Sequence, residues 1–461
     1  MAGKVPTEIE LPDHCWSDLV RSGLASRAGD ASGSGRFHVE PDLGLFLPLL
    51  SRFDVRLAPM HVRGCPVKFC TGTIKLARDP AMRRSAAATT IPAGGQSDTS
   101  SGAALSCLGE LSERLSLCSL GEQDSRVEID LTLQSQIEMA KVLGFSARQL
   151  RGVARQVGRQ VEGAGPDVPD LEQFSARTVN VRRLGDGMPA SCPSAGVLFG
   201  EFELITGRPG GFASTVGAAV WRDRDGARKR ALLELVERDA VAQAWYNRLG
   251  ITRIKIGFVS SVLPQQVAAH LDESRRFWGL YSVATDLQVH IALAVSCEAD
   301  GRRTAFGSAA GWDLASACKS AVTEMLQSKN ALDLMERAYG PQGAGSREPQ
   351  KLPKHLSYAR DRSVFDDFLL KADGSSAPPD PETVFTYDDL LDSCTAKGIA
   401  IWEFDATRSD LGIPCIKLIS PELCSWEPRF GKDRLFQGVV ERGLRAHPAA
   451  ESEFESRPFP F

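Results

Sequence analysis

The strongest constraint on this chain is a predicted helix at 228–246 that is apolar on nearly every side, with the sequence RKRALLELVERDAVAQAWY. A helix of this kind is normally buried. It nevertheless carries Glu234 and Glu237 one turn apart, followed directly by Arg238. Two buried carboxylates repel each other, and each carries a desolvation penalty unless a cation answers its charge. The segment therefore predicts a cation site inside the protein.

The same E-x-x-E-R spacing occurs earlier, in a predicted helix at 100–116 with the sequence SSGAALSCLGELSERLS. The helical period places Ser106, Glu110, Glu113 and Arg114 on one stripe. The opposite side carries apolar residues, namely Ala104, Leu108, Leu111 and Leu115. We expect this helix to pack on its leucines and to present two carboxylates, a hydroxyl and a guanidinium together.

A third predicted helix, at 315–335, offers Glu324 and Gln327 one turn apart. The three helices supply more carboxylates than Arg114 and Arg238 neutralise, namely Glu110, Glu113, Glu234, Glu237 and Glu324. Mg²⁺ binds carboxylate oxygens and keeps waters and phosphate oxygens as its other ligands. The chain contains no GxxxxGK[ST] loop, which excludes a P-loop enzyme. The residues favour an unusual magnesium–nucleotide site, and surface Glu–Arg pairs are the alternative.

The fold class follows from hairpins mixed with helices. Two β-rich runs flank a polar turn in each of three segments, at 178–200, 281–309 and 399–420. The first two lead through small-residue turns, at 210–220 and 306–313, into long helices. Such units predict an α+β fold and not a doubly wound parallel sheet. Stretches dense in Gly, Ser and Pro are interpreted as mobile loops, at 84–104, 340–353 and 372–382.

Charge and cysteine usage limit the class of protein. The net charge of −4 argues against a general nucleic-acid binder. No apolar run approaches the ~18 residues of a membrane-spanning helix, and the N-terminus does not read as a secretory signal. Eleven scattered cysteines without a CxxC pattern are typical of free thiols in a reducing cytoplasm. We therefore expect a cytoplasmic protein that contacts neither nucleic acid nor membrane.

These motifs, in this order, resemble the YcaO family. SCLGELSER matches the family's SxxxExxER nucleotide motif, LLELVERDA resembles its second glutamate-rich helix, and FGSAAGWDLASACKSAVTEMLQS resembles its third. IPCIKLISPEL (413–423) is similar to the strand that follows, and the end ESRPFPF is similar to the proline-rich terminus of azoline-forming members. Within the family, the chain resembles the cyclodehydratase (D) subunit of microcin-type thiazole/oxazole synthetases.

The resemblance implies a YcaO-type fold with repeated hairpin-plus-helix units. It divides the chain into an N-terminal extension (1–64), a YcaO-like ATP-binding catalytic domain (65–446) and a C-terminal tail that reaches the active site (447–461). In the tail, Pro458, Pro460 and Phe461 are the predicted catalytic residues, because two prolines would hold the end extended and deliver its carboxylate to a fixed place. Related tails often end on proline, whereas this chain ends on Phe461.

The implied activity is ATP-dependent cyclodehydration of Ser, Thr or Cys residues in a ribosomally made precursor peptide. The side chain attacks the preceding amide, the oxyanion takes the γ-phosphoryl of ATP, and loss of phosphate leaves an oxazoline or thiazoline. ATP and Mg²⁺ are the implied cofactors. The glutamates would hold Mg²⁺, Arg114 and Arg238 would contact phosphates or orient the glutamates, and Ser106 and Gln327 would help to place the nucleotide.

The resemblance also implies partners. Members of this type act in antibiotic biosynthesis, in a multi-subunit complex with a ubiquitin-activating-enzyme-like subunit that binds the leader of the precursor peptide. An FMN-dependent dehydrogenase often oxidises the azolines. We expect a hetero-oligomer. A basic stripe on the predicted helix at 135–162 is either a solvated face or a docking face, and consists of Arg148, Arg151, Arg155 and Arg159.

Two other functions stay open. The nearest is a YcaO enzyme that forms a thioamide or an amidine with the same ATP activation, although the proline-rich tail favours azoline formation. The second, from a different class, is a non-catalytic nucleotide-binding scaffold subunit.

Overall fold

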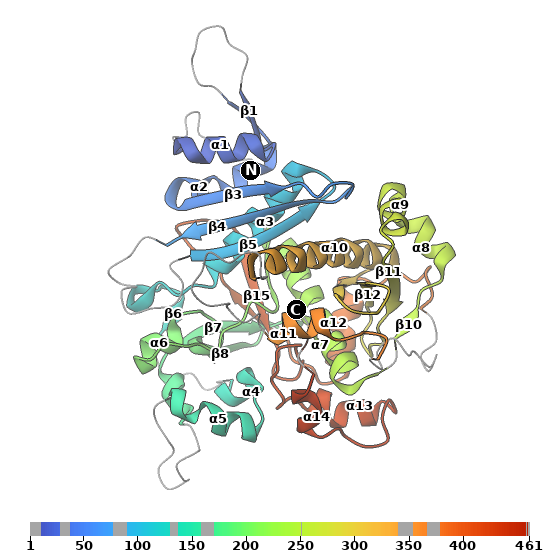
Figure 1. Cartoon of the computed structure of the whole chain (residues 1–461). Coiled ribbons are helices and arrows are strands. Elements are labelled where there is room, and N and C mark those ends of the chain that lie inside the picture. The colour runs from blue at the N-terminus through green and yellow to red at the C-terminus, as the bar shows by residue number, and fades with distance from the viewer. Residues whose placement is uncertain are drawn as a thin grey trace.

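The structure is a computed structural model that describes residues 11–27, 37–76, 90–129, 137–157, 170–249, 251–339, 354–366, 379–457 and 459. The described strands form four sheets, in which every strand pair is antiparallel. Long helices pack against the three larger sheets (Figure 1). The α+β fold predicted from the sequence is therefore confirmed.

The first sheet has the order β3-β4-β5 and carries helix α3 on one face (Figure 1). Its strands are β3 (Asp54–Met60), β4 (Lys68–Lys75) and β5 (Thr90–Ser97), and α3 spans Ser100–Ser116. The predicted boundary at residue 64 falls between β3 and β4, which pair along their length. The described residues before β3 form a small cap of α1 (Asp13–Arg21), β1 (Ala25–Arg27), β2 (Phe37–Val39) and α2 (Leu47–Arg52).

The second sheet repeats this arrangement with the order β10-β11-β12-β13 and the helix α10. Its elements are β10 (Thr252–Arg253), β11 (Phe277–Ser282), β12 (His290–Cys297), β13 (Ala305–Gly311) and α10 (Leu314–Tyr339). Glycine permits close contact between strand and helix in both units. A Cβ at Gly95 would lie 2.2 Å from the Ala103 carbonyl oxygen of α3, and a Cβ at Gly307 would lie 2.2 Å from the Ala321 carbonyl oxygen of α10.

The third sheet has the order β6-β7-β14-β15-β9, with β8 paired to β7. Its strands are β6 (Val127–Glu128), β7 (Thr178–Arg183), β8 (Pro189–Pro193), β9 (Ala218–Val220), β14 (Trp402–Asp405) and β15 (Cys415–Ile419). Helix α7 (Arg224–Asn247) packs against β15 and β9 of this sheet and against β13 of the second sheet. The side chain of Asp223 caps α7 by accepting the Gly226 N–H at 2.7 Å. Most of the C-terminal half of α7 is buried, as the apolar sequence predicts.

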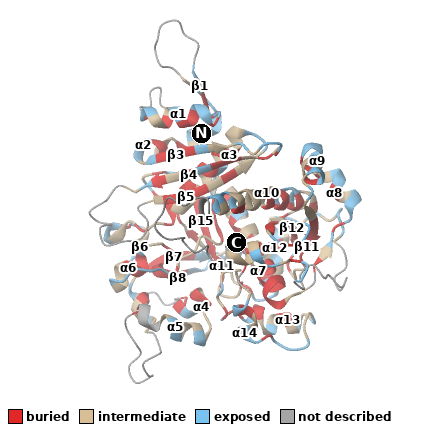
Figure 2. Cartoon of the chain, in the orientation of Figure 1, coloured by how far each residue is buried: buried red, intermediate tan, exposed pale blue. Residues whose placement is uncertain are grey.

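Shorter helices lie around these layers, and exposed residues gather on peripheral ones such as α8 and α9 (Figure 2). They are α4 (Met139–Leu143), α5 (Ala147–Val157), α6 (Glu201–Thr206), α8 (Ile256–Val262), α9 (Gln265–Glu273), α11 (Lys354–Asp361), α12 (Tyr387–Ala396), α13 (Gln437–Glu441) and α14 (Glu451–Glu455). None of the described helices is long and apolar enough to cross a bilayer. All eleven cysteines are free, as expected, and ten of them are buried.

Three local predictions were wrong. Residues 306–313 are mostly strand β13 and not a turn, because their small side chains fit beneath α10. The predicted loop at 84–104 contains all of strand β5, which pairs with β4. The predicted helix at 135–162 is interrupted at Gly144, whose φ of 62° lies in the left-handed region that favours glycine. The predicted loop at 340–353 and most of that at 372–382 lie outside the described residues.

Candidate magnesium–nucleotide site

Helices α3, α7 and α10 bring three of the five predicted glutamates to the strands β5 and β13. On α3, the Glu110 carboxylate accepts the Gly94 N–H at 2.9 Å. On α10, the Glu324 carboxylate accepts the Ser308 N–H at 2.8 Å. The two hairpin-plus-helix units thus use the same contact, in which a helix glutamate binds a backbone amide of the adjacent strand.

Glu237 joins α7 to the second of these units. Its carboxylate accepts the Ser308 hydroxyl at 2.6 Å and the Ala310 N–H at 3.2 Å. Ser308 therefore donates its hydroxyl to one helix and its backbone amide to the other. Glu237 is only 8% exposed, and its charge is met by hydrogen bonds and by Arg238 at 2.6 Å.

Glu113 and Glu234 lack comparable support. No described residue donates a hydrogen bond to the Glu113 carboxylate, and Glu234 is met only by Arg238 at 3.3 Å among the described residues. Burial, Glu234 and Glu110 raise the pKa of Glu113 well above its usual range, against Lys417 and Arg114. Burial and Glu237 raise the pKa of Glu234, although Arg238 and Lys417 oppose them. These two helices therefore present carboxylates that the described residues leave under-neutralised.

The third helix adds to this negative potential. Burial, followed by the neighbouring Glu237, raises the pKa of Glu324 to about 7. The same carboxylates stabilise the charged form of Arg238. Burial lowers its pKa, but Glu237, Glu234 and Glu324 together outweigh burial and raise it. Carboxylates from α7 and α10 thus act on one another within a single electrostatic cluster.

Both motif arginines lie beside their glutamates. Arg114 pairs with Glu110 and donates to the Pro92 carbonyl oxygen at 2.8 Å. Arg238 lies over the indole of Trp426, 3.4 Å from the ring centroid. Its buried Nε has no hydrogen-bond partner within the described residues.

The two remaining predicted residues differ in position. Gln327 reaches the same glycine as Glu110, since a Cβ at Gly94 would lie 2.7 Å from the Gln327 Nε2. Gly94 is thus the point where α3 and α10 converge. Ser106 is exposed on α3, and no contact joins it to the other predicted site residues in the described part of the chain.

Sequence reasoning missed three residues that shape the site. Asp239 is fully buried directly after Arg238, and its carboxylate accepts the Cys424 N–H at 3.0 Å and the guanidinium of Arg434. It fixes to α7 the segment that carries Trp426. Lys417 is a buried lysine in strand β15. Polar residues inside apolar segments were the available signal for Asp239 and Lys417, whereas nothing local indicates Trp426.

The C-terminal tail returns to α7. The Trp245 indole donates to the Arg457 carbonyl oxygen at 3.1 Å. Phe459 is 6% exposed and stacks on Trp426, with ring centroids 4.8 Å apart. The predicted catalytic residues Pro458, Pro460 and Phe461 lie outside the described residues.

The carboxylates fit Mg²⁺ bound together with a nucleotide. In the described ranges, no three His, Cys, Asp or Glu side chains are grouped so that they could hold one metal ion by themselves. Mg²⁺ seldom requires such a cage, because it usually takes one or two carboxylates together with phosphate oxygens and waters. The under-neutralised pair Glu113 and Glu234 meets that requirement.

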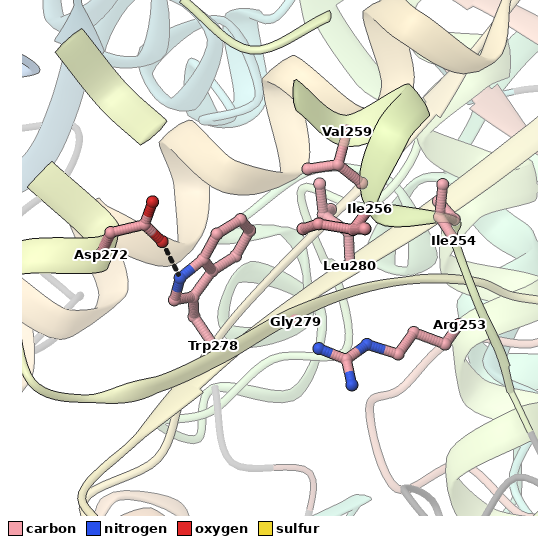
Figure 3. A pocket seen from close by; sticks show the side chains of 8 residues that line it. All are labelled: Arg253, Ile254, Ile256, Val259, Asp272, Trp278, Gly279 and Leu280. Carbon is pink, nitrogen blue, oxygen red and sulfur yellow. Dashed lines mark hydrogen bonds between the residues drawn. The ribbon is translucent and has the colours of Figure 1, made fainter. Parts of the chain in front are cut away.

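A separate pocket lies beside α8, α9 and β11, and none of the predicted site residues lines it (Figure 3). Aliphatic side chains form part of its wall, namely Ile254, Ile256, Val259 and Leu280. The Trp278 indole donates to Asp272 at 3.2 Å, so two polar groups of the pocket wall already bind each other. This pocket adds nothing to the glutamate cluster.

We compared the chain with known protein families and solved structures. A family model described as YcaO cyclodehydratase, ATP- and Mg²⁺-binding, matches residues 94–424. Among solved structures, a heterocyclase in complex with substrate and cofactor has a TM-score of 0.69 and 20% identity, covering 96% of this chain and 60% of that chain. The heterocyclase TruD has a TM-score of 0.58 and 21% identity, covering 77% of this chain and 50% of that chain.

A third solved structure is YcaO from Methanopyrus kandleri bound with AMPPCP and Mg²⁺. It has a TM-score of 0.55 and 14% identity, covering 85% of this chain and 89% of that chain. At these identities the likeness shows the fold alone. The present chain spans 60% and 50% of the length of the two heterocyclases. No curated protein matches the sequence significantly.

The family match spans most of the chain and contains α3, α7 and α10 entirely. Its description names ATP and Mg²⁺, so the two cofactors predicted from the sequence are confirmed. The chain belongs to the YcaO family.

Proposed function

We propose that this chain is an azoline-forming cyclodehydratase that uses ATP and Mg²⁺ on Ser, Thr or Cys residues of a ribosomally made precursor peptide. The observation that carries this proposal is the pair Glu113 and Glu234, two under-neutralised carboxylates from different helices of a YcaO fold. Two structures of similar fold are described as heterocyclases, which supports ring formation as the outcome.

The chain's own residues would divide the work of binding. Glu110, Glu113, Glu234, Glu237 and Glu324 would hold Mg²⁺, which neutralises charge on the triphosphate. Arg238 would contact phosphates or orient the glutamates, and its stack on Trp426 would keep the guanidinium plane fixed. Gln327 would place the nucleotide where α3 and α10 converge at Gly94.

The proposed reaction removes one water from the peptide for each ring. The side-chain hydroxyl or thiol bonds to the preceding amide carbon and loses its proton. The amide oxygen takes the γ-phosphoryl of ATP, leaving ADP. The C–O bond then breaks as phosphate departs, the amide nitrogen loses its proton, and a C=N bond closes the azoline. Because phosphorylation turns a poor leaving group into a good one, the protein mainly positions the reactants.

Mass spectrometry of the precursor peptide after incubation with the chain, its partner subunit, ATP and Mg²⁺ tests this proposal. Each azoline lowers the peptide mass by ~18 Da and releases one ADP, as the stoichiometry requires. A gain in mass would favour a thioamide instead. Absence of peptide-stimulated ATP hydrolysis in the assembled complex would favour a non-catalytic scaffold.

The proposed partners are a ubiquitin-activating-enzyme-like subunit that binds the leader of the precursor peptide and an FMN-dependent azoline dehydrogenase. Part of the predicted docking face is accessible, because Arg151 is exposed on α5. Arg148 is already paired with Glu455 at 3.0 Å. The side chains of Arg155 and Arg159 lie outside the described part of the structure.

A further inference from the structure

Strand β15 contains a lysine at a place where every neighbour in the strand is buried. Lys417 is 4% exposed, and its Nζ donates to the carbonyl oxygens of Ser214 and Val216, the latter at 2.7 Å. An ammonium group has three hydrogens to donate. No described residue accepts the third hydrogen of Lys417. A buried cation that is only partly satisfied requires negative charge nearby.

Carboxylates of the candidate site supply that charge. Lys417 lies within electrostatic reach of Glu113 on α3 and Glu234 on α7, and it lowers the pKa of both. In return, burial lowers the pKa of Lys417 to about 8, while Glu234, Glu427 and Glu113 oppose this fall and Arg429 reinforces it. Helix α7 packs directly against β15, and α3 packs against β9, which pairs with β15 at Ala218 and Lys417. Lys417 therefore lies in the sheet against which both helices with the least supported glutamates pack.

The loop that contains Ser214 and Val216, whose carbonyls accept from Lys417, is also held by two other side chains. Ser214 donates its hydroxyl to Glu427 at 2.6 Å, and Arg429 donates to the Phe212 carbonyl oxygen at 2.7 Å. The lysine therefore does not hold the loop alone. Its distinctive feature is the charge that it brings to the two glutamates.

The chain offers an internal comparison in Lys432, which is 8% exposed. Its Nζ donates to three carbonyl oxygens, those of Lys141 at 2.8 Å, Ser420 at 3.2 Å and Pro421 at 2.6 Å. Burial lowers its pKa to about 8 as well, yet its acidic neighbours are Cys424, Glu422 and Asp239 and not the glutamates of the site. In this fold, backbone carbonyls can thus accept a hydrogen bond from each of the three hydrogens of a buried lysine.

We propose that Lys417 is a positioning residue of the magnesium–nucleotide site, a fixed cation that partly neutralises Glu113 and Glu234 and thereby sets how strongly the site draws Mg²⁺. The inference rests on the proposed assignment of these glutamates as Mg²⁺ ligands. The lysine reduces the repulsion that α3 and α7 would otherwise experience before Mg²⁺ arrives. It also repels Mg²⁺, so that the ion is held together with the phosphates and not by the protein alone.

The test is a titration with MgCl₂ at a fixed concentration of a fluorescent ATP analogue, at pH 7.5, using the full chain. We expect Lys417→Met to lower the half-saturating Mg²⁺ concentration by roughly three- to tenfold, because a like charge near the ion has been removed. Lys417→Gln, which can still donate to the loop carbonyls, should give the same shift if the methionine variant folds poorly. Lys417→Arg should stay close to the wild type.

The matched control is Lys432→Met, which also removes a buried ammonium but should leave the half-saturating Mg²⁺ concentration unchanged. If the Lys417 variants match Lys432→Met, or need more Mg²⁺ than the wild type, Lys417 only supports the loop and the inference is wrong. A wild-type chain that binds the analogue without any dependence on Mg²⁺ would instead contradict the proposed function.

Discussion

The ring of Phe459 lies almost parallel to the indole of Trp426, with 8° between their planes and 4.8 Å between their centroids. The same indole carries the guanidinium of Arg238 at 3.4 Å. One aromatic side chain therefore connects the C-terminal tail to the second glutamate-rich helix. Trp245 holds the tail from another side, through the Arg457 carbonyl and an edge contact with Phe459.

The first prediction concerns this tail. Phe459→Ala should lower ring formation by orders of magnitude while the affinity for Mg²⁺–ATP is retained, because the tail loses its anchor but the glutamates keep their places. Deleting residues 457–461 should act alike, and so should adding a few residues after Phe461. Ring formation is followed by peptide mass, and nucleotide binding by calorimetry. Phe459→Trp, which can still stack, is the control, and full activity of the alanine variant would show that the anchor has no role.

The second prediction separates two glutamates that share a motif spacing. Glu113→Gln should abolish Mg²⁺–ATP binding while leaving the melting temperature equal or higher, because it removes repulsion from a carboxylate to which no described residue donates a hydrogen bond. Glu237→Gln should also abolish binding but should cost about 1–3 kcal/mol of stability, because Glu237 accepts from Ser308 and Ala310. Calorimetric titration and thermal melts measure both. Normal ATP affinity in both variants contradicts the magnesium assignment.

The third prediction follows from the raised pKa of Glu324, about 7 in the folded chain. A carboxyl whose pKa is raised by folding stabilises the protein fully below its unfolded pKa of ~4.3, and this stability is lost as the pH rises through 7. Without Mg²⁺, stability should fall by about 2 kcal/mol between pH 5 and pH 8. Denaturant melts in EDTA measure the fall. Glu324→Gln should reduce it, and an unchanged slope in that variant would count against the shift.

The fourth prediction concerns assembly. The isolated chain should form rings far more slowly than the complex, and Arg151→Glu should weaken binding to the partner subunit. The effect should shrink as salt is added, because exposed charges are screened within a Debye length. Lys397→Glu, a charge reversal at an exposed lysine beyond this stripe, is the control. Equal rates for the isolated chain and the complex would refute the need for a partner, and equal losses in both variants would refute this docking face.

The sequence by itself determined the three acid-bearing helices and their buried faces. Helical periodicity is local, so the leucine side of 100–116 and the apolar surround of Glu234 could be recognised without knowing what they pack against. Hairpins in an α+β fold were predictable for the same reason. The segments around Gly95 and Gly307 were predicted wrongly, because runs of small residues resemble turns. In the structure, the missing side chain at each glycine allows the strand to pack closely against a helix.

Only the tertiary structure decided how the glutamates differ. Glu113 and Glu237 hold equivalent places in their motifs, yet Glu237 reaches β13 and is satisfied there, whereas burial and the carboxylates of Glu234 and Glu110 raise the pKa of Glu113. The positions of Lys417 and Trp426 were likewise decided by packing across long sequence separations. A carboxylate's pKa and hydrogen bonds depend on whichever groups the fold places beside it, and no local pattern specifies those neighbours.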